Sequence, residues 1–175
     1  MKDLKPNLLR TALLVLCTLL VTGGPGSAVA QGKPKPKSAR VVGSALDDAL
    51  QAMVKRAEKL KIKGVAVVAY AEGETISGWT SKMAVVGGSV ATEPSGDNKG
   101  DNLLAIAYSK AAEMAATMKD SGSNVRAPRR GEFGWPGGLV IKVNSGYVIA
   151  AFSGGPSEDD VKCSRTGVEI LSKRL

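Results

Sequence analysis

Two short apolar segments near the end of the chain, 138–143 and 147–153, are separated by only three residues, Asn144-Ser145-Gly146. Asn and Gly in so short a connection are typical of a tight turn between two strands. Strands joined in this way form a hairpin, and a hairpin is antiparallel. The chain is therefore expected to fold around an antiparallel pair of strands.

Three other segments show the spacing of helices. Apolar residues recur every three or four positions over 45–62 and over 102–119, as they do along one side of a helix. Ser44, followed three residues later by Asp47, predicts a capping box at the start of the first helix. A third helix is predicted to begin at Ser157, because acidic residues fill its first turn and basic residues its last.

Strands are expected between the first two helices as well. The branched apolar segment 65–71 is typical of a central strand, and 75–80 and 83–90 predict two more. The resulting order is α-β-β-β-α-β-β-α. It indicates an α+β domain in which an antiparallel sheet of about five strands is flanked by helices.

The N-terminal residues predict export. Basic residues precede the apolar segment 11–22, and the small residues Ala28-Val29-Ala30 follow it. This pattern predicts a secretory signal peptide over 1–30 that is cleaved after Ala30. The apolar segment is short for a bilayer span, so no stable membrane anchor is expected. The mature protein is thus expected to be exported, either periplasmic or secreted.

A basic Lys/Pro linker is predicted over 31–43, before a folded domain over 44–175. The chain has 24 Lys and Arg against 16 Asp and Glu, but much of the excess lies in the signal peptide and the linker. The nearly neutral domain therefore predicts no nucleic-acid partner. The linker itself is interpreted as a spacer, or as a segment attracted to an anionic lipid or polymer.

The chain contains no histidine. This excludes Ser-His-Asp and Cys-His catalysis, imidazole metal sites and haem ligation through histidine. No pair of carboxylates stands out as a general acid and base, so conventional hydrolase or transferase activity is not expected. Cleavage of the signal would leave Cys163 as a lone cysteine, which can be a core residue, half of an intermolecular bridge or a soft ligand.

The last part of the sequence carries a recognisable motif. It comprises Pro136-Gly137-Gly138 before one strand, Ser153-Gly154-Gly155 after the next, and Asp159-Asp160 at a helix start. In this it resembles the GlcG/HbpS-like proteins, also called the haem-degrading-domain or haem-binding-protein family. Ser109-Lys110-Ala111 matches the middle helix of that family. The resemblance implies an antiparallel sheet flanked by helices, assembly into homo-oligomers and, for some members, haem binding, iron-linked redox sensing or oxidative haem breakdown.

The resemblance implies where a ligand would bind. The candidate ligand-binding residues are the motif positions and four basic side chains that could pair with haem propionates: Pro136, Gly137, Gly138, Ser153, Gly154, Gly155, Lys110, Arg126, Arg129 and Arg130. Possible iron ligands, each alternatively a plain core residue, are Tyr70, Tyr147, Met53, Met114, Met118 and, as the leading candidates, Tyr108, Met83 and Cys163.

Two functional hypotheses follow. The first is an exported small-ligand-binding protein whose leading ligand is haem or a related tetrapyrrole, with iron-dependent haem breakdown as a further activity left open. The second is an oligomeric accessory or interaction protein of the cell envelope with no ligand of its own. A change in the haem absorption spectrum on titration distinguishes them.

Overall fold

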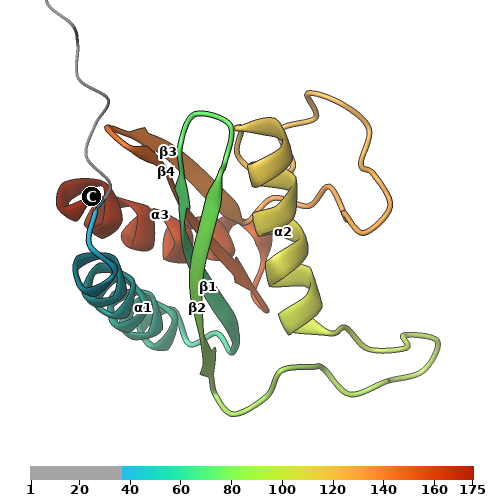
Figure 1. Cartoon of the computed structure of the whole chain (residues 1–175). Coiled ribbons are helices and arrows are strands. Elements are labelled where there is room, and N and C mark those ends of the chain that lie inside the picture. Colours follow the sequence, from blue (N-terminus) through green and yellow to red (C-terminus); the bar gives the residue numbers. More distant parts are fainter. Residues whose placement is uncertain (1–36) are drawn as a thin grey trace, which may run out of the picture. The chain divides into compact units, whose positions relative to one another are not determined.

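The computed structural model describes residues 37–175 (Figure 1). In chain order its elements are α1 (Ala39–Leu60), β1 (Gly64–Glu72), β2 (Gly78–Val86), α2 (Leu103–Thr117), β3 (Gly138–Val143), β4 (Gly146–Ser153) and α3 (Ser157–Arg174). The predicted signal peptide, its cleavage site at Ala30 and linker residues 31–36 lie outside the described residues. None of the helices within 37–175 is long and apolar enough to cross a membrane.

The strands of the described region form one sheet in the order β2-β1-β4-β3, and every neighbouring pair is antiparallel. The β3–β4 hairpin forms as predicted, with Val140 opposite Ile149. β1 and β4, which lie far apart in the sequence, pair in the middle of the sheet, with Ala69 opposite Ile149. The α+β class and the antiparallel sheet are therefore confirmed.

The number of strands differs from the prediction, because residues 37–175 contain four rather than five. The segments predicted as separate strands over 75–80 and 83–90 form the single strand β2. β2 pairs along its whole length with β1, from Gly78 opposite Glu72 to Val86 opposite Gly64. The chain leaves the sheet only at Gly87 and Gly88, where positive φ angles of 77° and 85° suit glycine.

Helices cover both faces of the sheet (Figure 1). One face, which includes Ala66, Val68 and Phe152, packs against α1 and α3 in one buried cluster. The opposite face, which includes Val65 and Val67, packs against α2 in a second cluster. Because successive side chains of a strand point to opposite faces, β1 must be apolar at nearly every position. Its continuous apolar sequence is therefore explained by its central place between two layers of helices.

The first helix begins earlier than predicted. Ser38, not Ser44, is the N-cap, and its hydroxyl accepts a hydrogen bond from the Val41 backbone N–H at 3.4 Å. Val42 is buried and extends the apolar side of α1 toward this cap. The helix therefore begins inside the segment 31–43 that the sequence predicted to be linker.

Candidate functional site

The motif residues of the sequence gather at one end of the sheet. Because β3 and β4 are antiparallel neighbours, the residues that enter β3 lie beside those that leave β4, and Gly138 is opposite Ala151. α3 begins directly after β4, which places Asp160 of its first turn at the same end. Lys110 reaches this point from the middle of α2. The fold thus brings together α2, the adjoining ends of β3 and β4, and the start of α3, which are separate in the sequence.

Lys110 and Asp160 form a buried ion pair at the centre of this cluster. The Lys110 ammonium lies 2.8 Å from Asp160 Oδ2 and donates to the Phe152 carbonyl at 2.7 Å. The two side chains are only 3% and 4% exposed. The other Asp160 oxygen accepts the Gly155 N–H at 2.9 Å. Burial raises the pKa of the Asp160 carboxyl, and the nearby ammonium offsets part of that rise.

Two glycines of the motif are required by close packing. A Cβ on Gly137 would lie 2.3 Å from the Lys110 ammonium, and one on Gly154 would lie 2.2 Å from the backbone carbonyl of Lys63. Gly138 is packed in the same way against Met114. Real Cβ atoms do not approach other atoms so closely, so these positions hold the buried pair and the crossing strands in place. Neither Gly137 nor Gly138 belongs to the lining of the cavity beside the ion pair.

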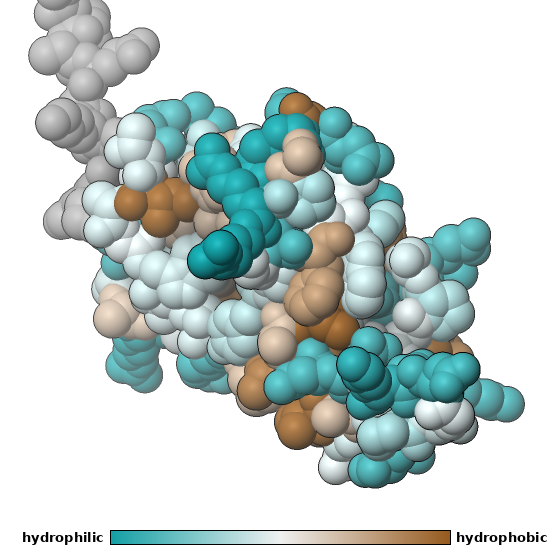
Figure 2. Space-filling view, turned by 90° about the vertical axis from the view of Figure 1, so that its right-hand side faces the viewer, coloured by the Kyte–Doolittle hydropathy of each residue, from teal (hydrophilic) through white to brown (hydrophobic). Residues whose placement is uncertain are grey.

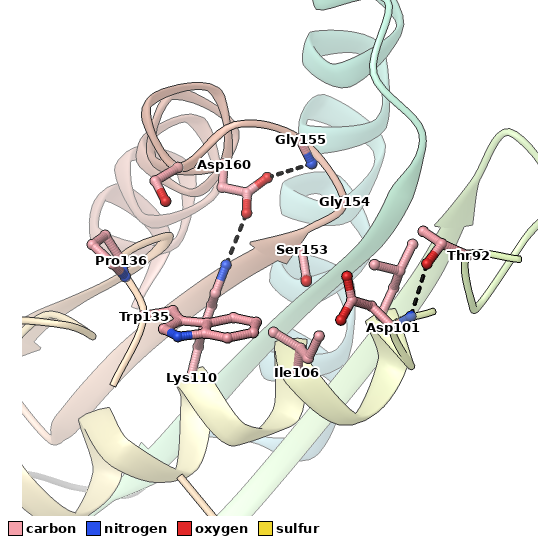
Figure 3. A pocket seen from close by; sticks show the side chains of 12 residues that line it. Thr92, Asp101, Ile106, Lys110, Trp135, Pro136, Ser153, Gly154, Gly155 and Asp160 are labelled. Carbon is pink, nitrogen blue, oxygen red and sulfur yellow. Dashed lines mark hydrogen bonds and ion pairs between the residues drawn. The ribbon is translucent and has the colours of Figure 1, made fainter. Parts of the chain in front are cut away.

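A polar cavity of about 180 Å³ opens beside the ion pair (Figure 3). Five of the predicted ligand-binding residues line it: Lys110, Pro136, Ser153, Gly154 and Gly155. Its wall also includes Asp101 and Thr92, which precede α2, together with Ile106 and Trp135. Sequence reasoning missed these four residues, because no motif or spacing connects them to the glycine-rich segments.

The predicted arginines lie elsewhere, in the long loop between α2 and β3. Arg126 forms a bidentate ion pair with Glu132, at 2.6 and 2.8 Å, and the Arg129 backbone N–H donates to the same carboxylate at 2.7 Å. None of the three arginines, including Arg130, lines the polar cavity. The structure therefore separates them from Lys110, and Arg126 serves to hold the loop.

The Arg126–Glu132 pair predicts a pH dependence of this loop. The hydrogen bond from Arg126 lowers the pKa of Glu132 from 4.5 to about 2. Since the folded pKa is lowered, the pair stabilises the loop above the ordinary carboxyl pKa and is lost as the pH falls toward about 2. An NMR titration of the Glu132 carboxyl should show a raised midpoint in Arg126→Gln. Arg130→Gln, which removes an exposed arginine, should leave it unchanged, and an equal midpoint in Arg126→Gln would contradict the pairing.

The candidate iron ligands fall on different sides of the sheet. Cys163 is fully buried among the residues under α1 and α3, and burial raises the pKa of its thiol to about 12. Its inert, enclosed position is that of a core residue.

Met83 is partly buried on β2 and faces α2, while Tyr108 of α2 is exposed. Tyr70 is buried and hydrogen-bonded to Ser145. Of the three leading candidates for the iron ligand, Tyr108 and Met83 thus lie on the same face of the sheet, and Cys163 lies on the other.

An apolar groove of about 380 Å³ lies on this face, between α2 and β2. It is lined by Trp79, Tyr108, Ala111, Ala112 and Ala115. Figure 2 looks onto the side of the described unit that carries α2 and shows apolar surface between hydrophilic side chains. Trp79 is 41% and Tyr108 37% exposed, which is high for aromatic side chains. The sequence suggested Tyr108 but gave no reason to place Trp79 beside it.

The groove and the polar cavity use opposite sides of α2. Ile106 and Lys110 are four residues apart and share the side that faces the cavity, whereas Tyr108, Ala112 and Ala115 face the groove. A change in one of these sites can therefore leave the other intact. Within residues 37–175, no three Cys, Asp or Glu side chains converge as a metal site.

Comparison with solved structures identifies the fold. No family model and no curated protein matches the sequence. The crystal structure of a PduOC:heme complex matches with a TM-score of 0.53 and 18% identity, over 73% of this chain and 91% of that one. The Klebsiella pneumoniae protein ORFY, described as DUF336, matches with a TM-score of 0.52 and 14% identity, over 74% and 88%. HbpS has a TM-score of 0.46 and 16% identity, over 81% and 97%.

The described unit is therefore an α+β domain of a class already known from solved structures, with helices on both faces of an antiparallel sheet. Its fold is GlcG/HbpS-like. The resemblance that the motif residues carry is confirmed at the level of the fold.

Proposed function

We propose that this protein is an exported small-ligand-binding protein that holds haem or a related tetrapyrrole in the groove between α2 and β2. The observation that carries the proposal is the groove itself, an open apolar surface walled by two exposed aromatic side chains. A haem complex formed by a protein of the same fold supports the choice of ligand. Export rests on the predicted signal peptide.

Size separates the two candidate sites. Pockets that bind small molecules have volumes of roughly 300–1,000 Å³ and are mostly apolar. The groove, at about 380 Å³, falls in this range for drug-sized ligands, whereas the polar cavity, at about 180 Å³, is too small for a molecule as large as a tetrapyrrole. The alanines of α2 leave a flat wall, and the Trp79 indole offers an aromatic surface for a planar ring. A tetrapyrrole therefore fits the groove better than the motif cavity.

Tyr108 is the residue best placed to hold the iron. It lines the groove, and its hydroxyl makes no hydrogen bond with any residue from 37 to 175. Tyrosine is an established haem ligand in proteins, so the absence of histidine does not prevent ligation. A bound haem would supply iron redox chemistry, including any haem breakdown, while the groove would bind the ring and shield one side of it from water.

The proposal predicts saturable haem binding that depends on the groove. A titration of the purified protein should shift the Soret band, and Ala112→Gln, which places a larger polar side chain in the groove, should weaken binding by about tenfold. Ala116→Gln, at an exposed position of the same helix outside the groove lining, is the matched control and should bind normally. No Soret change at micromolar haem would overturn the proposal.

Tyr108→Phe separates ring binding from iron ligation. The substitution keeps the aromatic ring and removes the phenol oxygen, so the Soret maximum of bound haem should move while the affinity for iron-free protoporphyrin stays the same. An unchanged haem spectrum would show that another group holds the iron, and Met83, the other leading candidate on this face, would be tested next. Addition of ascorbate in air then tests haem breakdown, which would appear as bleaching with release of iron.

The second candidate function is an oligomeric accessory protein of the cell envelope. It is favoured by further exposed aromatic side chains, since Phe133 and Trp135 lie with ring centroids 4.9 Å apart in the loop before β3. Exposed aromatic residues are common at protein interfaces. A flat haem titration together with an oligomer mass in light scattering would favour this function. A monomer that captures no envelope component would contradict it.

A further inference from the structure

We propose that the polar cavity beside the Lys110–Asp160 pair is a second ligand site, and that it takes a small zwitterion of amino-acid size. The site goes beyond the tetrapyrrole proposal, because it lies on the opposite side of α2 from the groove. It is built from the end of β4, the start of α3 and the residues around the start of α2 (Figure 3).

A serine hydroxyl without a protein hydrogen bond faces the cavity. Ser153 is only 4% exposed and lines the cavity, yet its hydroxyl makes no hydrogen bond with the part of the chain that the structure describes. Figure 3 shows this hydroxyl pointing into the space above Ile106. The oxygen is reached from the cavity, since it is not among the fully enclosed unpaired atoms of the described region. Its hydrogen-bond partner must therefore come from the cavity, either as water or as a bound molecule.

Further hydrogen-bond donors converge on the same space and suit a carboxylate. The Lys110 ammonium carries three N–H groups, and two of them are used by Phe152 and Asp160. α3 begins at the cavity with Ser157, and its N-cap, Pro156, provides no side-chain cap. The Asp159 and Asp160 N–H groups donate to the Pro156 carbonyl, so the N–H groups left free at this helix start are those of Ser157 and Glu158. Free N–H groups at a helix start favour a negatively charged partner. Together with Ser153, these groups can bind one carboxylate.

The rim of the cavity carries a negative charge, in contrast to the hydrogen-bond donors inside it. The Asp101 carboxylate points into the cavity in Figure 3 and belongs to no ion pair within residues 37–175. Its backbone N–H is held by the Thr92 hydroxyl at 2.8 Å, which fixes the residue beside the opening. A simple anion would be repelled by the Asp101 carboxylate. A ligand that also carries an ammonium group would instead pair with Asp101.

The dimensions restrict the ligand to a small one. A volume of about 180 Å³ equals roughly six water molecules in the liquid, which leaves room for a molecule as small as L-alanine. Leu103, Ile106 and Trp135 provide an apolar wall against which a short side chain could pack. The cavity has hydrogen-bond donors inside, a carboxylate at its rim and a small apolar wall. This arrangement matches an amino acid better than a simple acid or a simple amine.

Ligand-observed NMR with L-alanine tests the proposal on the purified protein. We expect millimolar binding of alanine, and weaker binding of acetate and ethylamine, each of which carries half of the charge pattern. Asp101→Asn should weaken alanine binding by about tenfold, and Ser153→Ala should weaken it as well. Asp97→Asn, an exposed position in the same loop, is the control and should bind like the wild type.

Two results would overturn the site. If alanine, acetate and ethylamine all fail to bind, the cavity holds water only. If alanine binds with the same affinity to wild type and Asp101→Asn, it binds elsewhere. The groove variant Ala112→Gln must keep alanine binding, so failure of this proposal and failure of the tetrapyrrole proposal are observed separately.

Discussion

Asp160→Asn is expected to lower the free energy of unfolding by about 3–5 kcal/mol, because it leaves the Lys110 ammonium buried without its charged partner. Lys110 and Asp160 are both almost fully buried, so water in the adjoining cavity can replace only part of the lost interaction. Urea unfolding followed by circular dichroism measures the effect. The loss is large relative to the total stability of a domain of this size.

A matched control lies one residue earlier on the same helix. Asp159 forms an ion pair with Lys162 at 2.7 Å, but this pair is open to solvent, since Lys162 is 48% and Asp159 24% exposed. Asp159→Asn should therefore cost no more than about 1 kcal/mol. The double variant Lys110→Met/Asp160→Asn should cost less than the sum of the single variants, because neither charge remains buried alone. Equal losses in Asp160→Asn and Asp159→Asn would show that the buried pair does not stabilise the fold.

Gly154→Ala should destabilise the protein by about 3 kcal/mol or more. The new Cβ would lie 2.2 Å from the Lys63 carbonyl and 2.7 Å from the Gly64 Cα, both of which are backbone atoms that cannot rotate away. The φ angle of +140° is also one that other residues rarely adopt. Thermal unfolding would register the change as a clearly lower midpoint.

Gly43→Ala provides the comparison for this prediction. Gly43 lies inside α1, and the nearest atom to a Cβ there would be the Lys82 ammonium at 4.0 Å. Alanine should raise the stability by about 0.5–1 kcal/mol, since glycine is unfavourable inside a helix. If Gly154→Ala unfolded at the wild-type midpoint while Gly43→Ala behaved as expected, the close approach of β1 and β4 would not require glycine.

These two predictions change the interpretation of the motif. Gly137 and Gly154, together with Lys110, were candidate ligand contacts, yet their closest neighbours are atoms of the protein itself. The glycines allow three chain segments to approach one another, and the ion pair joins α2 to α3. The motif residues are thus required mainly for the packing of the fold. The same fold can therefore occur in proteins that bind different ligands.

Some of the candidate site could be predicted from the sequence. Ser153, Gly154 and Lys110 were identified from the motif, and the structure places them together on the cavity. Trp79 and Asp101 could not be found in this way, because they carry no local pattern and reach their sites only through the packing of β2 and α2. Arg126 is the opposite case, since its charge in a loop suggested a ligand contact and the structure pairs it with Glu132.

The sequence by itself determined the helices, the β3–β4 hairpin and the α+β class, because turn chemistry and apolar spacing act over a few neighbouring residues. It could not determine whether 75–90 held one strand or two, since β2 is defined by its pairing with β1. Only the tertiary structure decided that Lys110 and Asp160, fifty positions apart, neutralise each other in the interior. Such contacts, and the cavity and groove on either side of α2, depend on which surfaces pack together, and local pattern does not encode that packing.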